Sequence, residues 1–506
     1  MKTSRFSILS VASGILLPAL LASCAPRIPE AYTDAETETA ITPDYTRLTI
    51  PCNIAPLNFR IDTVADNYPV HFYSGKDAEG FTVDGRTTDI PADRWHKLTC
   101  DAMGDSVFAD IYVEHSGRWT RYPKAMRNAV ADSIDPYISY RLIEPSYISF
   151  ETMAICQREL GSFDEKEIFN SQALSTEKEG QCMNCHSYQD YNREGNMQMH
   201  FRVREGGTLV SHGGQLKKVN LKTGSTVSSG VYPSWHPTEA LIAYSVNTTT
   251  QSFHTNDRNK VEVQDAASEI ILYDVKTDRI SHISTQGNDS SRLATFPYWH
   301  PDGKGLWYAE AAVPPMTKRA MALYQNTNFE DFRYDILYRP FDIATHSFGS
   351  PDTIFAASEF GMSATLPRPS PDGRYLLFTM GRFGTFHIWH RDSDLYIKDL
   401  STGETRPMEE LNSNDVESYH SWSSNGRWII FSSRRDDGSY TRLYIAYFGR
   451  DGKAHKPFRL PQQSPDHDTE RMKSYNIPEF MVCPVEISKR QIIETVQSDP
   501  INATEQ

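Results

Sequence analysis

The sequence predicts a mainly β protein with a small N-terminal β domain, a connector, and a larger C-terminal part built from repeated β units. Three observations lead to this fold class. Short alternating segments separated by Gly, Asp and Pro precede the connector, and a Pro- and Trp-rich turn recurs in the second half. The chain has 506 residues, too many for one ordinary hydrophobic core. A hydrophobic content of 39% and an aromatic content of 11% are typical of folded soluble proteins.

The N-terminus predicts export. Lys2 and Arg5 precede an apolar run over residues 8–21, which is interrupted by Gly14 and Pro18 and is too short for a permanent membrane span. Residues 1–23 therefore form an expected signal peptide, and Leu-Ala-Ser before Cys24 resembles a bacterial lipoprotein lipobox. The resemblance implies lipidation of Cys24, a membrane anchor, and a periplasm-facing place in the bacterial cell envelope. The polar residues 24–45 would then form a flexible tether.

Residues 46–124 are expected to form a small β-sandwich-like domain. Alternation of apolar and polar residues over 57–61, 70–73 and 108–113, with turn residues between them, fits half-buried strands. Cys52 and Cys100 fall in this domain and form either one disulfide or two buried thiols. The connectivity of Cys52, Cys100, Cys156 and Cys483 does not follow from the sequence.

Residues 125–200 are expected to form a partly helical connector. Ser162 and Glu165 have the S-x-x-E spacing of a helix capping box, and the Asp135-Pro136 and Glu144-Pro145 pairs divide the segment into short pieces. The connector carries the most specific motif of the chain.

That motif is Cys182-Met183-Asn184-Cys185-His186, the C-x-x-C-H spacing that attaches c-type heme. Two thiols at this spacing each form a thioether with one vinyl group of heme, and the adjacent imidazole becomes an axial ligand of the iron. We therefore expect one covalent heme c bound by Cys182, Cys185 and His186. Export agrees with this expectation, because bacteria attach c-type heme outside the cytoplasm.

Other interpretations of the C-x-x-C pair remain open. A redox dithiol normally opens a helix in a βαβ unit, and no such unit is visible in the sequence. A structural zinc site requires a second Cys or His pair, and none lies nearby. Cys182 and Cys185 could also form a structural disulfide.

The second axial ligand is expected just beyond the motif. We favour His200, with Met199 as runner-up, and Met197 and His212 as further candidates. Methionine ligation raises the reduction potential of a heme relative to histidine ligation, so the choice has chemical consequences. The alternative is that these side chains serve only in packing or hydrogen bonding.

Residues 201–485 contain the repeats. Each unit has a turn followed by an apolar strand. The turns are Tyr232-Pro-Ser-Trp-His-Pro, Phe296-Pro-Tyr-Trp-His-Pro-Asp-Gly, Leu366-Pro-Arg-Pro-Ser-Pro-Asp-Gly and Tyr419-His-Ser-Trp-Ser-Ser-Asn-Gly. They resemble the WD-like repeats of TolB-type β-propellers, although His replaces Ser in two units and Trp is missing from the third. The resemblance implies a β-propeller of five or six blades and a role in protein interaction. Residues 474–480 would close the ring, and residues 486–506 would form a C-terminal tail.

These features favour a membrane-anchored monoheme electron carrier that docks a redox or envelope protein through its propeller. The alternative is a TolB-like envelope interaction protein without heme. No nucleophile–base pair, H-E-x-x-H motif or phosphate-binding loop indicates an enzyme. His236, His300 and His420 recur in repeat turns and are expected to lie apart, without a shared metal. The formal net charge of −14 argues against nucleic acid as a partner.

Overall fold

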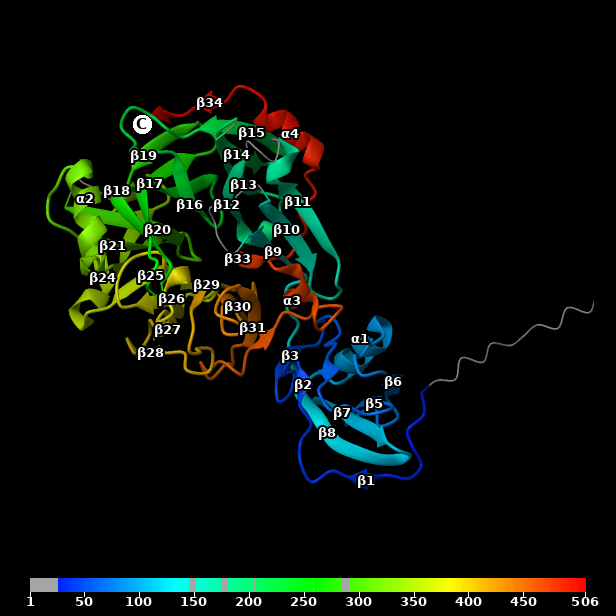
Figure 1. The fold of residues 1–506 in the computed structure, drawn as a ribbon. Coiled ribbons are helices and arrows are strands. Elements are labelled where there is room, and N and C mark those ends of the chain that lie inside the picture. The colour runs from blue at the N-terminus through cyan, green and yellow to red at the C-terminus, as the bar shows by residue number, and fades with distance from the viewer. Residues whose placement is uncertain (1–25, 145–151, 175–180, 204, 258, 284–290) are drawn as a thin grey trace, which may run out of the picture.

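The computed structural model describes residues 26–144, 152–174, 181–203, 205–257, 259–283 and 291–506. The expected signal peptide and Cys24 lie outside the described residues. The fold is mainly β and β-propeller-like, with six small sheets arranged in a ring and a further sheet to one side (Figure 1). Each sheet of the ring, called a blade below, has four or five strands.

The N-terminal domain is one mixed sheet covered by a helix. The sheet has the order β1-β8-β7-β5-β6, with β3 also paired to β8. Its strands are β1 (Thr33–Asp34), β3 (Thr49–Pro51), β5 (Pro69–Ser74), β6 (Phe81–Asp84), β7 (Ser106–His115) and β8 (Arg118–Ala131). The layer beside it consists of helix α1 (Ala92–Asp101) and a ribbon of β2 (Ile41–Thr42) and β4 (Arg60–Ile61).

This domain differs from the expected β-sandwich. Trp95 of α1 is fully buried, and its ring meets that of Phe72 edge-on at 6.1 Å. Alternation along a strand shows that one face is buried, but it does not show whether a sheet or a helix covers that face. The strands were therefore predictable, and their covering layer was not.

The blades follow one another along the chain, and the first strand named for each blade is the innermost. Blade 1 consists of β33 (Ser474–Met481), β9 (Tyr137–Ile143), β10 (Ala154–Glu159) and β11 (Glu165–Asn170). Blade 2 consists of β12 (Cys182–Tyr188), β13 (Met197–Arg202), β14 (Gly207–His212), β15 (Gln215–Asn220) and β34 (Ile501–Asn502). Blade 3 consists of β16 (Gly230–Trp235), β17 (Leu241–Phe253), β18 (Val261–Asp274), β19 (Arg279–His282) and β35 (Thr504–Glu505).

The other three blades are built in the same way. Blade 4 consists of β20 (Arg292–Trp299), β21 (Gly305–Ala312), β22 (Asp335–Asp342), β23 (Ser347–Phe348) and β24 (Asp352–Phe355). Blade 5 consists of β25 (Ser363–Pro369), β26 (Tyr375–Gly381), β27 (Asp394–Asp399) and β28 (Thr405–Pro407). Blade 6 consists of β29 (Glu417–Trp422), β30 (Trp428–Ser433), β31 (Arg442–Tyr447) and β32 (Phe458–Arg459). Helix α2 (Lys318–Asn328) is inserted in blade 4, and α3 (His467–Arg471) precedes β33.

The expected partly helical connector is corrected by the structure. Residues 125–200 contain the end of β8, strands β9 to β12 and most of β13, with only two three-residue 3-10 turns among the described residues. Ser162 caps a turn instead of a helix, because its Oγ donates to Glu159 and accepts from the backbone N–H of Asp164. Glu165 then begins β11. A hydroxyl can satisfy backbone donors in turns as well as at helix starts, so the capping spacing was ambiguous.

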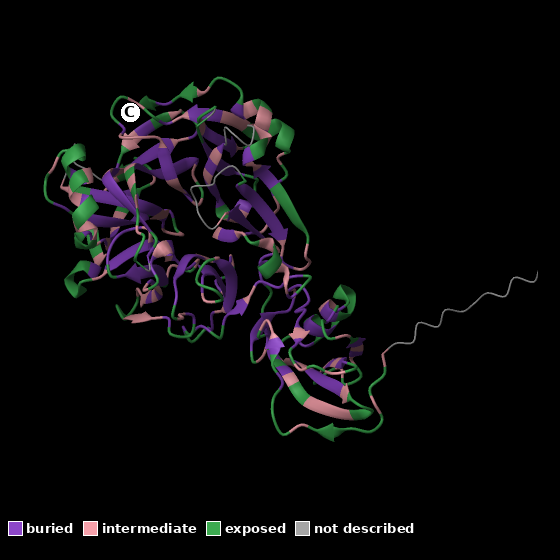
Figure 2. Cartoon of the chain, in the orientation of Figure 1, coloured by how far each residue is buried: buried purple, intermediate pink, exposed green. Residues whose placement is uncertain are grey.

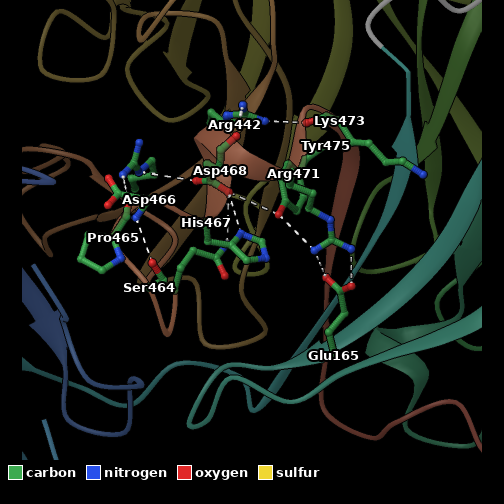
Figure 3. A network of polar contacts seen from close by, with 12 residues as sticks. Glu165, Arg442, Ser464, Pro465, Asp466, His467, Asp468, Arg471, Lys473 and Tyr475 are labelled. Atoms are coloured by element: carbon green, nitrogen blue, oxygen red, sulfur yellow. Dashed lines mark hydrogen bonds and ion pairs between the residues drawn. The ribbon is translucent and has the colours of Figure 1, made fainter. Parts of the chain in front are cut away.

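The ring is closed by a late segment of the chain. Strand β33 pairs antiparallel with β9 and supplies the innermost strand of blade 1, so two distant parts of the sequence share one sheet. Figure 3 shows the polar network beside it: Arg471 pairs with Glu165 of β11, and Arg442 of β31 donates to the carbonyls of Lys473 and Asp468. This network fastens α3 and β33 to blades 1 and 6. The resulting number of blades lies within the expected range.

The C-terminal segment runs over the outside of blades 2 and 3 (Figure 1). After helix α4 (Lys489–Val496), strand β34 pairs in parallel with β15, and β35 pairs in parallel with β19. Outer strands otherwise expose unpaired backbone groups that favour aggregation. Residues 501–505 thus cover two sheet edges.

The N-terminal domain packs on blades 1 and 6. One hydrophobic core includes Trp95 from the domain together with Tyr140 and Trp428 from these blades. Trp428 Nε1 donates to the carbonyl of Ser133 at 3.2 Å, and the Ser424 hydroxyl donates to Asp135. The described residues along this contact are largely buried (Figure 2). The domain and the ring therefore share core packing.

Candidate functional site

Every innermost strand of the ring contains a bulge at the same place. The pairing register shifts there by one residue, and the first bulged residue has a positive φ of 45° to 55°. Such φ values are uncommon for residues other than glycine, and bulges redirect side chains. The six residues are Cys185, Tyr232, Phe296, Leu366, Tyr419 and Ile477.

These six residues surround the axis of the ring. They line a small space of about 30 Å³, which we call the waist. On one side of it lies a cavity of about 720 Å³, the upper cavity, and on the other a cavity of about 270 Å³, the lower cavity. The inner strands run in the same sense, because residues before the bulge line the upper cavity and residues after it line the lower one. The heme-attachment motif lies in β12, across the waist.

Both motif cysteines face the upper cavity. Cys182 and Cys185 are free thiols that line it, and burial raises the pKa of the Cys182 thiol. The backbone around Cys185 is held at both polar groups. Its N–H donates to Asn184 Oδ1 at 2.8 Å, and its carbonyl accepts from the side-chain amide of Gln198. These contacts fix the position of the thiol even though the residue occupies a bulge.

His186 lies at the waist and is 1% exposed. Neither ring nitrogen meets a hydrogen-bond partner of good geometry in the part of the chain that the structure describes. Burial and the positive charge of Arg141 lower the pKa of His186 to about 3, and the nearby backbone of Ile477 opposes this only slightly. The imidazole is therefore neutral at physiological pH. Buried polar atoms without partners are uncommon and call for an explanation, such as an absent ligand.

The candidates for a second axial ligand face different sides of their strands, because side chains alternate along a pleated strand. His200 is 3% exposed, lines the upper cavity and is placed by a 3.1 Å contact between its Nδ1 and Thr208 Oγ1. Met199 and Met197 point to the other face of β13, into the hydrophobic core between blades 1 and 2. His212 stacks on Trp235 at 6.2 Å and does not line the cavity. Of the four residues, His200 alone faces the thiols' cavity.

Two buried arginines also line the upper cavity. Arg141 of β9 is 5% exposed and Arg434, just after β30, is 8% exposed. Arg141 donates to Asn184, and Arg434 stacks over the Trp389 ring at 3.9 Å. Burial lowers the pKa of Arg434 to about 10. The Arg434 guanidinium therefore remains charged at physiological pH, and the cavity wall around it includes the aromatic residues Tyr232, Phe386, Trp389 and Tyr419.

Glu479 of β33 is the main titratable group beyond the waist. It lines both the waist and the lower cavity, together with Arg368, whose guanidinium stacks over Tyr298 at 4.1 Å. Burial raises the pKa of Glu479 to about 7, against the opposing charge of Arg368. A carboxyl that changes charge near neutral pH therefore faces the same narrow space as His186.

The repeated histidines lie apart from one another. His236 Nε2 donates to the Gly303 carbonyl at 3.0 Å, His300 contacts Asp302 at 2.8 Å, and His420 Nε2 donates to the Leu377 carbonyl at 3.2 Å. His236 and His300 hold blade turns, whereas His420, in the bulge of β29, bonds to strand β26 of blade 5. Within the described ranges, no group of three or more His, Cys, Asp or Glu side chains is arranged to hold a metal ion.

A long hairpin forms one wall of the upper cavity. Strands β17 and β18 extend beyond the blade, and Asn247, Thr249, Gln251, Phe253 and Val263 of this extension line the cavity. The hairpin is held to blade 5 by a fully buried pair between Glu262 and His390, 2.9 Å apart. None of the helices in the described part of the chain is long and apolar enough to cross a bilayer.

Comparison with known proteins yields similarities of shape alone. No protein-family model matches the chain, and no curated protein sequence does so either. TolB from Acinetobacter baumannii is similar with a TM-score of 0.42 and 14% identity, covering 87% of this chain and 98% of TolB. A hypothetical selenium-binding protein from Sulfolobus tokodaii has a TM-score of 0.43 and 8% identity, covering 70% and 96%. Hydrazine synthase of Kuenenia stuttgartiensis has a TM-score of 0.38 and 10% identity, covering 65% and 47%. No function follows from these values.

The structure shows a correspondence between two segments that was not predicted from the sequence. Cys185-His186-Ser187-Tyr188 occupies the bulge position of its blade, as Tyr419-His420-Ser421-Trp422 does in blade 6. The heme-attachment motif is thus also the first copy of the repeat. The agreement of His, Ser and an aromatic residue between the two segments was visible in the sequence and could have revealed it.

Proposed function

We propose that this chain binds one c-type heme in the upper cavity and transfers single electrons. Cys182 and Cys185 would form the thioethers, and His186 would be the proximal ligand. The observation that carries the proposal is the meeting of two free thiols at the wall of a 720 Å³ cavity with a neutral, buried imidazole at the adjoining waist.

The residues present fit the group. Sites for ligands of this size usually have volumes of about 300–1,000 Å³ and mostly apolar walls with a few placed polar groups. The volume of the upper cavity lies in this range, and its wall combines the aromatic rings of Tyr232, Phe386 and Trp389 with many polar side chains. When bound, heme supplies one-electron chemistry whose potential depends on its axial ligands and on burial.

The chain's own residues would position the heme and exclude water. Asn184 and Gln198 hold the backbone of Cys185, so its thiol stays at the cavity wall. His200 would be the second ligand, because it faces the cavity while Met199 lies in the core. The neutral state of His186 leaves a nitrogen lone pair available for the iron without loss of a proton.

The cellular setting belongs to the same proposal. Lipidation of Cys24 would hold the protein at the membrane of a bacterial cell envelope, facing the periplasm, where c-type heme is attached. A redox or envelope protein would dock on the blades. The β-propeller-like ring supports this role, because loops and blade faces offer a broad binding surface.

The test is heme attachment in cells that contain a cytochrome c maturation system. We expect a heme-stained band on a denaturing gel and a c-type pyridine hemochrome spectrum for the wild type. Cys182→Ser with Cys185→Ser should lose the stain, and Cys156→Ser, at a buried thiol outside the cavity, should keep it. A folded wild-type protein without covalent heme would rule out the proposal.

A second candidate is the envelope interaction protein without heme. The observation that favours it is the shared bulge position of Cys185-His186 and Tyr419-His420, which gives His186 a structural role like that of His420. Cys182 and Cys185 would then form a disulfide. In that case, the serine double variant retains partner binding, and the wild type has no Soret absorbance.

A further inference from the structure

Arg141 and Arg434 are buried arginines without a close ion pair among the described residues, although the negative charges of Asp415 and Asp437 act on Arg434. Apart from the bond from Arg141 to Asn184, neither side chain forms a hydrogen bond or ion pair of good geometry within that part of the chain. The Nε atoms of both are buried and unpaired there. Both side chains are more than nine-tenths buried, and both line the upper cavity.

Other buried arginines of this chain have oxygen acceptors for their terminal nitrogens, although the Nε of Arg158 is also unpaired among the described residues. Arg158 donates from both terminal nitrogens, to the carbonyl of Pro461 and to Gln462. Arg442 likewise donates to two backbone carbonyls. Removing a charge from water is unfavourable unless paired or hydrogen-bonded groups replace the water. The N–H donors of the two cavity arginines are therefore available to a ligand.

The two guanidinium groups come from neighbouring strands. Arg141 lies opposite Asn476 in the pairing of β9 with β33, and Arg434 directly follows β30, which packs on β33. Trp389 covers one face of the Arg434 guanidinium and leaves its edge to donate. Arginine binds carboxylates through two parallel N–H donors, and stacking on an aromatic ring preserves that geometry.

We propose that Arg141 and Arg434 bind the two carboxylates of a ligand in the upper cavity. Two sources supply this chemistry. In the first, which rests on the proposed function, the carboxylates are the propionates of the heme held by Cys182 and Cys185. In the second, they belong to a free dicarboxylic acid. The aromatic wall around the arginines favours the first source, because a large apolar ring system would fill the remaining volume.

The test uses the full chain produced without heme maturation. Mesoporphyrin carries two propionates but no vinyl groups, so it cannot form thioethers, and its dimethyl ester lacks the carboxylates. We expect the wild type to bind mesoporphyrin at least tenfold more tightly than the ester, as measured by quenching of protein fluorescence. Arg141→Gln with Arg434→Gln should remove this preference. Arg382→Gln, at an exposed arginine paired with Asp392, should retain it.

Thermal-shift measurements with succinate and citrate test whether a free dicarboxylic acid binds the site. Stabilisation of the wild type by these acids, lost in the double variant, together with no preference for mesoporphyrin, assigns the site to a free dicarboxylate. If the double variant fails to fold, the single variant Arg434→Lys, which keeps the charge but loses the paired donors, is used with the same ligands. The proposal is overturned if the variants bind as the wild type does, or if the wild type binds neither ligand class.

Failure of carboxylate binding can be distinguished from failure of covalent heme attachment. Cys182→Ser with Cys185→Ser abolishes covalent heme but leaves both arginines in place, so carboxylate binding persists in it. Conversely, loss of binding in the arginine variants with heme staining retained would show that attachment does not depend on them.

Discussion

Asp265 shows how burial changes the charge state of a single side chain. It is 5% exposed in the long hairpin and accepts hydrogen bonds from Asn247 at 2.6 Å and Thr249 at 3.0 Å. Burial raises its pKa from 3.8 to about 7 despite these bonds. The unfolded chain therefore releases this proton at a lower pH than the folded chain.

We predict that Asp265 contributes stability that is lost as pH rises from about 4 to 7, and that Asp265→Asn removes this contribution. Over this range Asp265 holds its proton in the folded state and releases it in the unfolded state, so its contribution decreases by up to about 1.4 kcal/mol per pH unit. Urea unfolding at pH 4.5, 5.5 and 6.5 measures the slope. An unchanged slope in the variant would assign the dependence to other groups.

Cys52 and Cys100 are the second residue-scale case. The Cys100 thiol donates to the Cys52 carbonyl at 3.5 Å, and burial together with Cys100 raises the pKa of Cys52. The two thiols are thus neighbours, as the sequence suggested, and either state of the pair is compatible with the fold.

We predict that this pair forms a disulfide when the chain is exported, and that Cys52→Ser lowers the free energy of unfolding by about 2–4 kcal/mol. Mass spectrometry of a non-reduced digest should find the two cysteines in one linked peptide. Cys156→Ser is the control, because Cys156 lies in β10 of blade 1. Alkylation of both thiols in denatured, non-reduced protein would contradict the prediction.

The sequence identifies candidate residues when their role depends on their spacing along the chain. Cys182, Cys185 and His186 could be selected because the chemistry demands a fixed spacing. Arg141 and Arg434 could not, because no local pattern distinguishes them from solvated arginines, and their common cavity exists only after the ring has closed. The sequence ranked His200 above Met199, but only the strand pleat shows which of the two side chains faces the cavity.

At the scale of elements, an ion pair adds to the strand pairing that closes the ring. Arg471 and Glu165 pair through two hydrogen bonds, and Tyr140 also donates to Glu165. Although burial opposes it, the hydrogen bonds from Arg471 and Tyr140 hold the pKa of Glu165 below its ordinary value. The contribution of Glu165 to stability is therefore present above its ordinary pKa and is lost as pH falls below it.

We predict that Arg471→Ala destabilises the fold by about 1–3 kcal/mol at pH 7 and by less near pH 3. Arg490→Ala, in an exposed pair with Glu494 on α4, is the matched control and should change stability little, because exposed ion pairs are screened by water. Chemical unfolding at both pH values measures the two effects. Equal losses from both substitutions would show that Arg471 is no more than a surface partner.

The tight turns between strands could be predicted from their residues. Strands whose sheet is completed by a distant part of the chain could not. The Asp-Gly and Asn-Gly turns at Gly303, Gly373 and Gly426 each have a positive φ and join an inner strand to the next strand, as expected. Strands β9 to β11 were assigned to a connector. They pair with one another locally, but β33, the innermost strand that completes their sheet by pairing with β9, lies more than 300 residues away in the sequence. Pairing over such a distance leaves no local signal.

At the scale of the whole molecule, the N-terminal domain and the ring behave as one packed body. Trp428 is fully buried where they meet, and its indole N–H is satisfied by the domain's Ser133. Large apolar contacts of this kind couple the unfolding of neighbouring domains.

We predict that Trp428→Ala lowers the free energy of unfolding by about 3–5 kcal/mol, because it leaves a cavity and an unpaired carbonyl. The domain and the ring should then unfold in separate transitions, visible by calorimetry. Leu323→Ala, at an exposed position on α2, should change stability by less than about 0.5 kcal/mol. A single unshifted transition in the tryptophan variant would contradict the shared packing.

The position of β33 sets an order of events during biosynthesis. Ser474, Asn476 and Ile477 belong to the wall of the upper cavity, yet they are made long after Cys182 and Cys185. A chain that emerges N-terminus first presents its thiols in an incomplete ring, open along the side where β33 will lie. A group joined to them at that stage is enclosed when the last strand is seated. The strand that completes blade 1 thereby also determines when the cavity ceases to be accessible from that side.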